Sequence, residues 1–100
     1  MSDSQPNDPR LTQLAAWLAQ LESPKTLPQT LRVASADASF RRYFRVDAED
    51  GSTLIVMDAP PPQEDVRPFI EVAELFGATG VTVPKILARD VDNGFLLLTD

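Results

Sequence analysis

The most informative residue for chemistry in this sequence is an arginine that falls among apolar side chains. Strand-like alternation over residues 40–46 places four side chains on one face, namely Phe40, Arg42, Phe44 and Val46. A buried arginine must meet an anion or several hydrogen-bond acceptors. The phosphate of a nucleotide is one such anion for Arg42, and a structural ion pair is the alternative. The acidic residues considered for that pair are Asp58, Glu71 and Glu74.

Composition limits the chemistry that is available elsewhere in the chain. Histidine and cysteine are absent from the 100 residues, which excludes disulfides and the usual zinc and transition-metal sites. Carboxylates remain as ligands for a hard cation, but we predict no metal site in this chain. A net charge of −6 disfavours a nucleic-acid partner.

Nothing in the sequence indicates contact with a membrane. No apolar run approaches the roughly 20 residues that span a bilayer. The opening Met1-Ser2-Asp3-Ser4 has neither the basic start nor the apolar stretch of a signal peptide. We therefore expect a cytoplasmic protein.

Helical periodicity and proline mark the first element. Residues 1–8 are expected to be disordered, and residues 9–30 to form an N-terminal helix and a linker. Asp8-Pro9 offers an N-cap followed by a proline suited to a first turn. Apolar side chains then repeat at helical spacing at Leu11, Leu14, Ala15, Leu18 and Leu21. The predicted helix covers residues 9–22.

Five strands and a second helix are predicted after the linker. The strands are expected over residues 31–34, 40–46, 53–57, 85–89 and 95–98. Hairpin turns are predicted at Asp50-Gly51 and at Asp92-Asn93-Gly94, because Asp-Gly and Asn-Gly favour tight turns. Apolar residues at i, i+3 and i+4 predict a helix that begins near Glu64-Asp65 and ends between Gly77 and Gly80.

This order of elements predicts an α+β fold with a five-stranded antiparallel sheet, one packing helix and an extra N-terminal helix. Three segments carry a resemblance to the aminoglycoside phosphotransferase-like family: residues 36–46 (ADASFRRYFRV), 54–61 (LIVMDAPP) and 94–100 (GFLLLTD). The Gly-x-x-Val-Pro pattern at residues 80–84 also resembles that family. Within it, residues 31–100 look most similar to the bacterial anomeric kinases of N-acetylmuramate and N-acetylglucosamine, which serve cell-wall recycling.

The resemblance implies that residues 31–100 form a kinase-like N-terminal lobe that works with its own C-terminal lobe, which is absent from this chain. It implies ATP and Mg²⁺ as cofactors and a small-molecule sugar as the substrate. The catalytic base and the metal ligands are expected on the absent lobe, so no catalytic residue is predicted here. Residues 1–100 alone are therefore expected to show no kinase turnover.

The resemblance also implies roles for particular residues. Ser35, Ala38 and Ser39 belong to the loop that covers the phosphates in a kinase small lobe. Met57 falls where protein kinases carry a lysine that contacts phosphate and pairs with a helix glutamate. The other positions implied to contact nucleotide are Arg42, the adenine wall Ile55, the helix glutamate Glu71, and the hinge residues Leu98 and Asp100.

Structural alternatives stay open at this point. The loop at residues 35–39 has no glycine and is also typical of an ordinary turn. Ile55, Val33 and Leu97 would be core residues in any version of the fold. Glu71 could pair with Arg67 on a solvated helix face. Because methionine carries no charge, either Arg42 supplies the phosphate contact in place of Met57 or the nucleotide binds weakly.

Two other functions stay open as well. The acceptor could be an aminoglycoside antibiotic or another small alcohol, since acceptor contacts lie on the absent lobe. A non-catalytic pseudokinase or interaction module is indicated by Met57 and by the glycine-free loop.

Overall fold

The computed structural model describes residues 9–36, 41–61, 64–80 and 84–100. Its elements are α1 (Pro9–Gln20), β1 (Thr26–Ala36), β2 (Arg42–Ala48), β3 (Thr53–Asp58), α2 (Arg67–Ala78), β4 (Ile86–Asp90) and β5 (Phe95–Thr99). The strands pair antiparallel in the order β1-β2-β3-β5-β4. The predicted α+β fold is thereby confirmed, and it is consistent with the small lobe of a kinase. Residues 1–8, which we expected to be disordered, lie outside the described residues.

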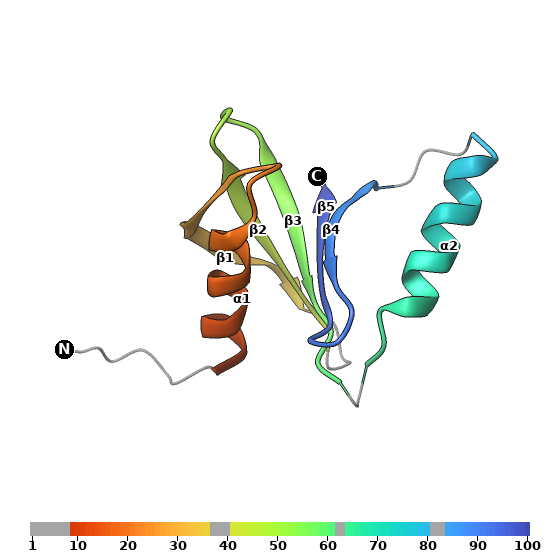
Figure 1. Ribbon diagram of the computed structural model, residues 1–100, viewed down its shortest axis with the longest axis horizontal. Helices are drawn as coiled ribbons and strands as arrows, with labels where there is room; N and C mark the ends of the chain where they lie inside the picture. The colour runs from red at the N-terminus through yellow and green to blue at the C-terminus, as the bar shows by residue number, and fades with distance from the viewer. Residues whose placement is uncertain (1–8, 37–40, 62–63, 81–83) are drawn as a thin grey trace.

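Helix α1 covers one face of the sheet and closes a core there (Figure 1). Leu14 and Leu18 lie one turn apart and are fully buried, which stabilises the fold by about 2 kcal/mol for each leucine. They pack with side chains of β2, β3 and β5: Phe44, Val46, Ala48, Leu54, Val56, Phe95 and Leu97. The rings of Trp17 and Phe95 add a contact with centroids 5.6 Å apart. We call this side of the sheet the α1 face.

Helix α2 lies on the opposite side of the sheet, which we call the α2 face (Figure 1). Val66, just before the helix, and Ile70 are buried there against Met57, Leu96 and Leu98. The outer side of the helix is apolar but exposed, with Val72 at 50%, Leu75 at 63% and Phe76 at 44% of full exposure. Among the described residues, α2 is therefore held to the sheet mainly through its first turns.

The start of α2 falls slightly later than predicted. Glu64 and Asp65 precede the helix, and an Asp65 carboxylate oxygen accepts a hydrogen bond from the backbone N–H of Arg67 at 3.0 Å. The acidic pair therefore lies before the first turn instead of within it. The helix ends within the predicted range, and Gly80 follows with a φ of +86° that favours glycine.

Strand β1 is longer than the sequence predicted. We expected a strand over residues 31–34 after a linker, whereas β1 begins at Thr26, which pairs with Ala48 of β2. The strand lies at the edge of the sheet, where proline is tolerated, and its register shifts between Leu27 and Arg32 where Pro28 occurs. The edge position also leaves Val33 69% exposed, so the prediction that it belongs to the core is wrong.

The β4–β5 hairpin is confirmed, and its glycine is required by packing. Gly94 has a φ of +77°, and a Cβ atom built there would lie 1.9 Å from the carbonyl oxygen of Ala59. The backbone N–H of Ala59 donates to the carbonyl oxygen of Gly94 at 2.8 Å. This close approach joins the hairpin to the end of β3, where several charged side chains of the candidate site meet.

Candidate functional site

Cross-strand pairing sorts the predicted site residues between the two faces of the sheet, because directly paired residues project to the same side. Tyr43 of β2 pairs with Ser35 of β1 and with Met57 of β3. Ile55 of β3 pairs with Leu98 of β5. The register therefore brings Ser35, Ile55, Met57 and Leu98 together on the α2 face.

The apolar residues of this group differ in exposure. Met57 is fully buried and packs with Val66 and Ile70, so the position where protein kinases carry a lysine belongs here to the core. Leu98 is 3% exposed, and Ile55 is partly buried. The apolar strip of Ile55 and Leu98 on the α2 face is thus continuous with the buried cluster, because Leu98 belongs to that cluster and Ile55 packs against it.

Arg42 lies on the opposite, α1 face, as the alternation predicted. Its Nε and Nη2 atoms donate to one carboxylate oxygen of Asp58, at 3.2 and 2.7 Å. The guanidinium carbon lies 5.3 Å from the centre of the Phe44 ring. The ion pair with Asp58, which we considered as an alternative to a phosphate contact, is present, and the structure separates Arg42 from Met57 and Ile55.

A second arginine, which the sequence did not predict as a partner, binds Asp58. Arg10 of α1 donates from Nε to the other carboxylate oxygen of Asp58 at 3.0 Å and from Nη2 to the carbonyl oxygen of Asn93 at 2.6 Å. Its guanidinium carbon lies 4.7 Å from the Phe95 ring centre. Asp58 is fully buried, so two arginines compensate one buried carboxylate. The sequence did hold one indication of this pair: Asp58 ends an apolar strand, and a buried carboxylate requires cationic or hydrogen-bonding partners.

Arg41 points to the α2 face, opposite Arg42, as strand alternation predicts; from the sequence we expected its side chain to be solvated. Its Nη2 atom donates to a carboxylate oxygen of Glu64 at 2.9 Å. The Arg41 side chain is 30% exposed and that of Glu64 only 15%. A hydrogen bond with the Tyr43 side chain, and to a lesser degree the bond to Glu64, raises the pKa of Arg41. A fixed, accessible cation therefore lies on the same face as the strip of Ile55 and Leu98.

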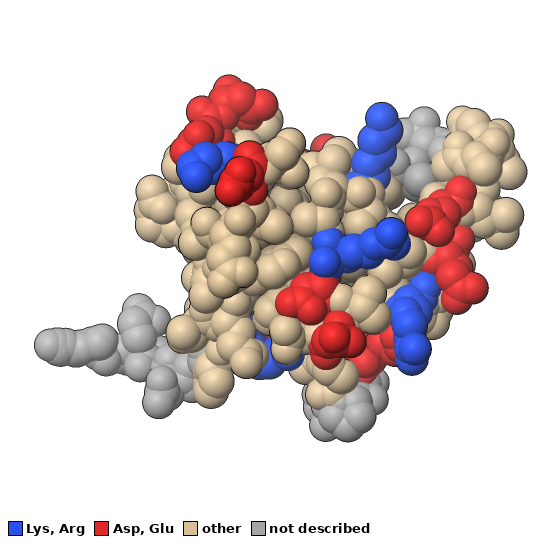
Figure 2. Space-filling view, in the orientation of Figure 1, with Lys and Arg blue, Asp and Glu red and all other residues tan. Residues whose placement is uncertain are grey.

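Glu71, the predicted helix glutamate, lies exposed on α2. It lines a hollow of about 320 Å³ between α2 and β4, together with Arg67 and Arg89. Arg67, which we considered as its partner, donates instead to Asp65, with Nη2 at 2.8 Å. Figure 2 shows basic and acidic side chains side by side on this part of the surface. The carboxylate that binds Arg41 is thus that of Glu64, whereas Glu71 lies with Arg67 and Arg89 in this hollow.

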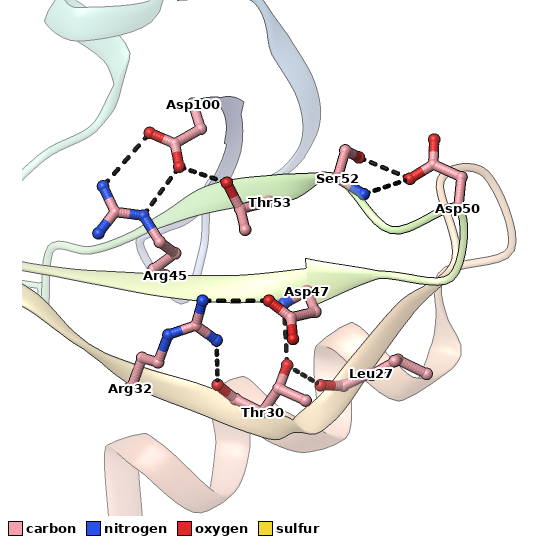
Figure 3. A network of polar contacts seen from close by, with 9 residues as sticks. All are labelled: Leu27, Thr30, Arg32, Arg45, Asp47, Asp50, Ser52, Thr53 and Asp100. Carbon is pink, nitrogen blue, oxygen red and sulfur yellow. Dashed lines mark hydrogen bonds and ion pairs between the residues drawn. The ribbon is translucent and has the colours of Figure 1, made fainter.

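Asp100, the predicted hinge residue, is anchored to β2 and β3 (Figure 3). Its carboxylate accepts hydrogen bonds from Arg45, at 2.8 and 3.3 Å, and from the Thr53 hydroxyl at 2.6 Å. The bond from Arg45, and then that from Thr53, lowers the pKa of Asp100. The same figure shows a second exposed pair, in which Arg32 donates to Asp47 at 3.1 Å.

Two predicted loop residues, Ala38 and Ser39, lie outside the described residues. Within the described ranges, no group of three or more histidine, cysteine, aspartate or glutamate side chains is placed to hold a metal ion. A second groove between α2 and β4, of about 460 Å³, is lined by none of the predicted site residues. In the same part of the chain, no helix is long and apolar enough to cross a bilayer.

A model of the phosphotransferase enzyme family matches residues 30–99. The chain is 52% identical to an N-acetylmuramate/N-acetylglucosamine kinase of Pseudomonas aeruginosa, over 94% of this chain and 30% of that protein. Kinases with the same name in Pseudomonas putida and Neisseria meningitidis are 43% and 42% identical, over 94% and 91% of this chain.

The match covers only part of these relatives. The chain spans 30% of the two Pseudomonas proteins and 26% of the Neisseria protein. No solved structure matches the chain.

Proposed function

We propose that this chain, which belongs to the phosphotransferase enzyme family, forms the ATP-binding lobe of a longer amino-sugar kinase. The observation that carries this proposal is the 52% identity over 94% of the chain with a protein named N-acetylmuramate/N-acetylglucosamine kinase. Identity at that level over the whole lobe supports a shared acceptor class. The proposed reaction is transfer of the γ-phosphoryl group of ATP to the anomeric hydroxyl of the sugar.

The α2 face offers the features that a nucleotide needs. Binding sites for small molecules are mostly apolar with a few fixed polar groups. Ile55 is partly exposed and offers an apolar surface that suits the face of adenine, and it is supported from below by its pairing with the buried Leu98. Thr99 and Asp100 follow directly in the chain, where backbone groups could meet the edge of the base. Arg42 receives no role in this proposal, because its guanidinium is bound to Asp58 on the other face.

ATP bound with Mg²⁺ supplies the phosphoryl group and much of the charge neutralisation in such reactions. This chain holds and orients the nucleotide and shields one side of it from water. Following the family resemblance, we propose that the catalytic base and the metal ligands lie outside this chain, so residues 1–100 alone should not turn over ATP.

A non-catalytic role is favoured by one specific observation. Met57 is fully buried where protein kinases carry the phosphate-binding lysine. If no other cation replaced that lysine, the lobe would bind ATP weakly, and the full-length protein would act as a pseudokinase. An aminoglycoside acceptor is a further alternative, since it changes only contacts that lie outside this chain.

A coupled assay of ADP release by the full-length protein tests the proposal. Mg-ATP would be supplied with N-acetylglucosamine, N-acetylmuramic acid or kanamycin as the acceptor. We expect turnover with the amino sugars and none with kanamycin. Turnover with kanamycin alone would move the protein to the antibiotic branch, and no turnover together with no binding of ATP would favour the pseudokinase.

A further inference from the structure

Arg41, just before β2, and Arg42, its first residue, point to opposite faces of the sheet. Arg42 reaches Asp58 on the α1 face, with Nη2 at 2.7 Å. Arg41 reaches Glu64 on the α2 face, with Nη2 at 2.9 Å. Arg41 and Arg42 have the same charge and are neighbours in sequence, but of these two only Arg41 shares a face with Ile55 and Met57.

The surroundings of Arg41 hold its charge in place. Glu64 belongs to the segment between β3 and α2, and its backbone N–H donates to the carbonyl oxygen of Pro60 at 3.0 Å. Its carboxylate is mostly buried, with 15% of the side chain exposed. Tyr43, two residues along the chain from Arg41, packs against the buried cluster around Met57. The guanidinium is thus held by a fixed carboxylate while 30% of the Arg41 side chain stays open to solvent.

Other described arginines on or beside the α2 face fit a phosphate site less well. Arg45 pairs with Ile55 and is bound to Asp100. It lies further along β2 from the β1–β2 connection than Arg41 does. Arg32 is bound to Asp47, and Arg89 lies 3.7 Å from Glu74 on edge strand β4. Arg41 alone combines a position directly after the β1–β2 connection with a mostly buried anchor.

We propose that Arg41, anchored by Glu64, is the residue of this lobe that binds the nucleotide phosphates. The inference rests on the proposed function, because it assumes that ATP lies on the α2 face. Arg41 would replace the cation that Met57 cannot supply, and Glu64 would take the part that we first assigned to Glu71. The planar guanidinium suits this arrangement, since its N–H donors form a fork that can bind a carboxylate on one edge and a phosphate on another.

The test compares two ligands that differ only in their phosphates. Dissociation constants for ATP and for adenosine would be measured by calorimetry on the full-length protein and on four variants: R41M, R41K, E64Q and R67M. Melting temperatures of the same samples would report on folding. Arg67 is the matched control, because its side chain is 71% exposed and is paired with its neighbour Asp65.

We expect R41M to weaken ATP binding at least tenfold and to leave adenosine binding unchanged, since only ATP carries the charge that Arg41 would meet. R41K should recover part of the loss, because lysine keeps the charge but not the fork. E64Q should give a smaller loss than R41M, because the cation remains but is held less firmly. R67M should bind both ligands like the wild-type protein.

The outcomes separate this inference from the proposed function. Wild-type affinity for ATP in R41M would overturn the role of Arg41 and leave the proposed function standing. Equal losses for ATP and adenosine in R41M, or a loss in R67M as large as that in R41M, would also overturn it. A wild-type protein that binds neither ligand would contradict the proposed function itself.

Discussion

The two faces of the sheet differ in how completely a helix covers them. On the α1 face, Leu14 and Leu18 are fully buried against the strands. On the α2 face, only Ile70 of helix α2 is buried, and Leu75 stays 63% exposed. The closed face contributes stability, whereas the open face leaves Ile55 partly exposed and the anchored charge of Arg41 accessible. The proposed nucleotide site lies on the face that the fold leaves open.

The same difference appears in two aspartates near the ends of neighbouring strands. Asp58 is fully buried on the α1 face, between Arg10 and Arg42. Asp100 is exposed and is bound by Arg45 and Thr53 from the α2 face. A buried carboxylate that loses its partners is costly, whereas an exposed pair contributes little. The two aspartates should therefore respond very differently to substitution.

Asp58→Asn is expected to have the largest effect. Arg10 and Arg42 would lose their buried anion. The NH₂ group of asparagine would also need a hydrogen-bond acceptor, and both arginines are donors. We therefore expect the free energy of unfolding to fall by about 4 kcal/mol. Urea unfolding of the full-length protein, followed by circular dichroism, would measure the change. Asp65→Asn is the control, since that carboxylate is exposed. A loss below about 1 kcal/mol for Asp58→Asn would contradict the importance of this bridge.

Leu18→Ala should have the next largest effect. The side chain is fully buried on the α1 face, and its truncation should cost about 3 kcal/mol in the same unfolding experiment. Leu75→Ala on the outer side of α2 makes the same chemical change at an exposed position and should cost less than about 0.5 kcal/mol.

Equal losses for the two leucines would break the comparison between the faces. They would show that the outer side of α2 is covered in the full-length protein by residues that lie outside this chain. The exposed side chains of Val72 and Phe76 would then belong to the same covered surface.

Sequence patterns predicted the elements well where the signal is local. The apolar repeat of the first helix and the Asn93-Gly94 turn each lie within a few residues, and both were found. Strand β1 was cut short because Pro28 normally ends a strand, and only the edge position of β1 makes it acceptable. Its extra residues pair with β2, a contact that no pattern within β1 reveals.

The candidate site was predicted less well, because its contacts join distant parts of the chain. Alternation placed Arg42 and Arg41 on opposite faces, and the structure agrees. The partner Arg10 lies 48 residues before Asp58, and Glu64 lies 23 residues after Arg41, so spacing gave no sign of either pair. The family resemblance pointed to Glu71, whose exposed place on α2 depends on how the helix packs.

Asp100→Asn should have the smallest effect and should appear mainly in the pH dependence. The pKa of Asp100 is lowered from its ordinary value of 3.8 by Arg45 first and then by Thr53. The folded state therefore gains stability from the charged carboxylate above about pH 4, and this gain is lost as pH falls through the lowered pKa. The urea midpoints of wild type and variant should differ slightly at pH 6 and converge toward pH 3. Thr53→Val should change the urea midpoint less than Asp100→Asn does. If the difference between wild type and Asp100→Asn stayed constant with pH, the charged Arg45–Asp100 pair would contribute nothing to stability.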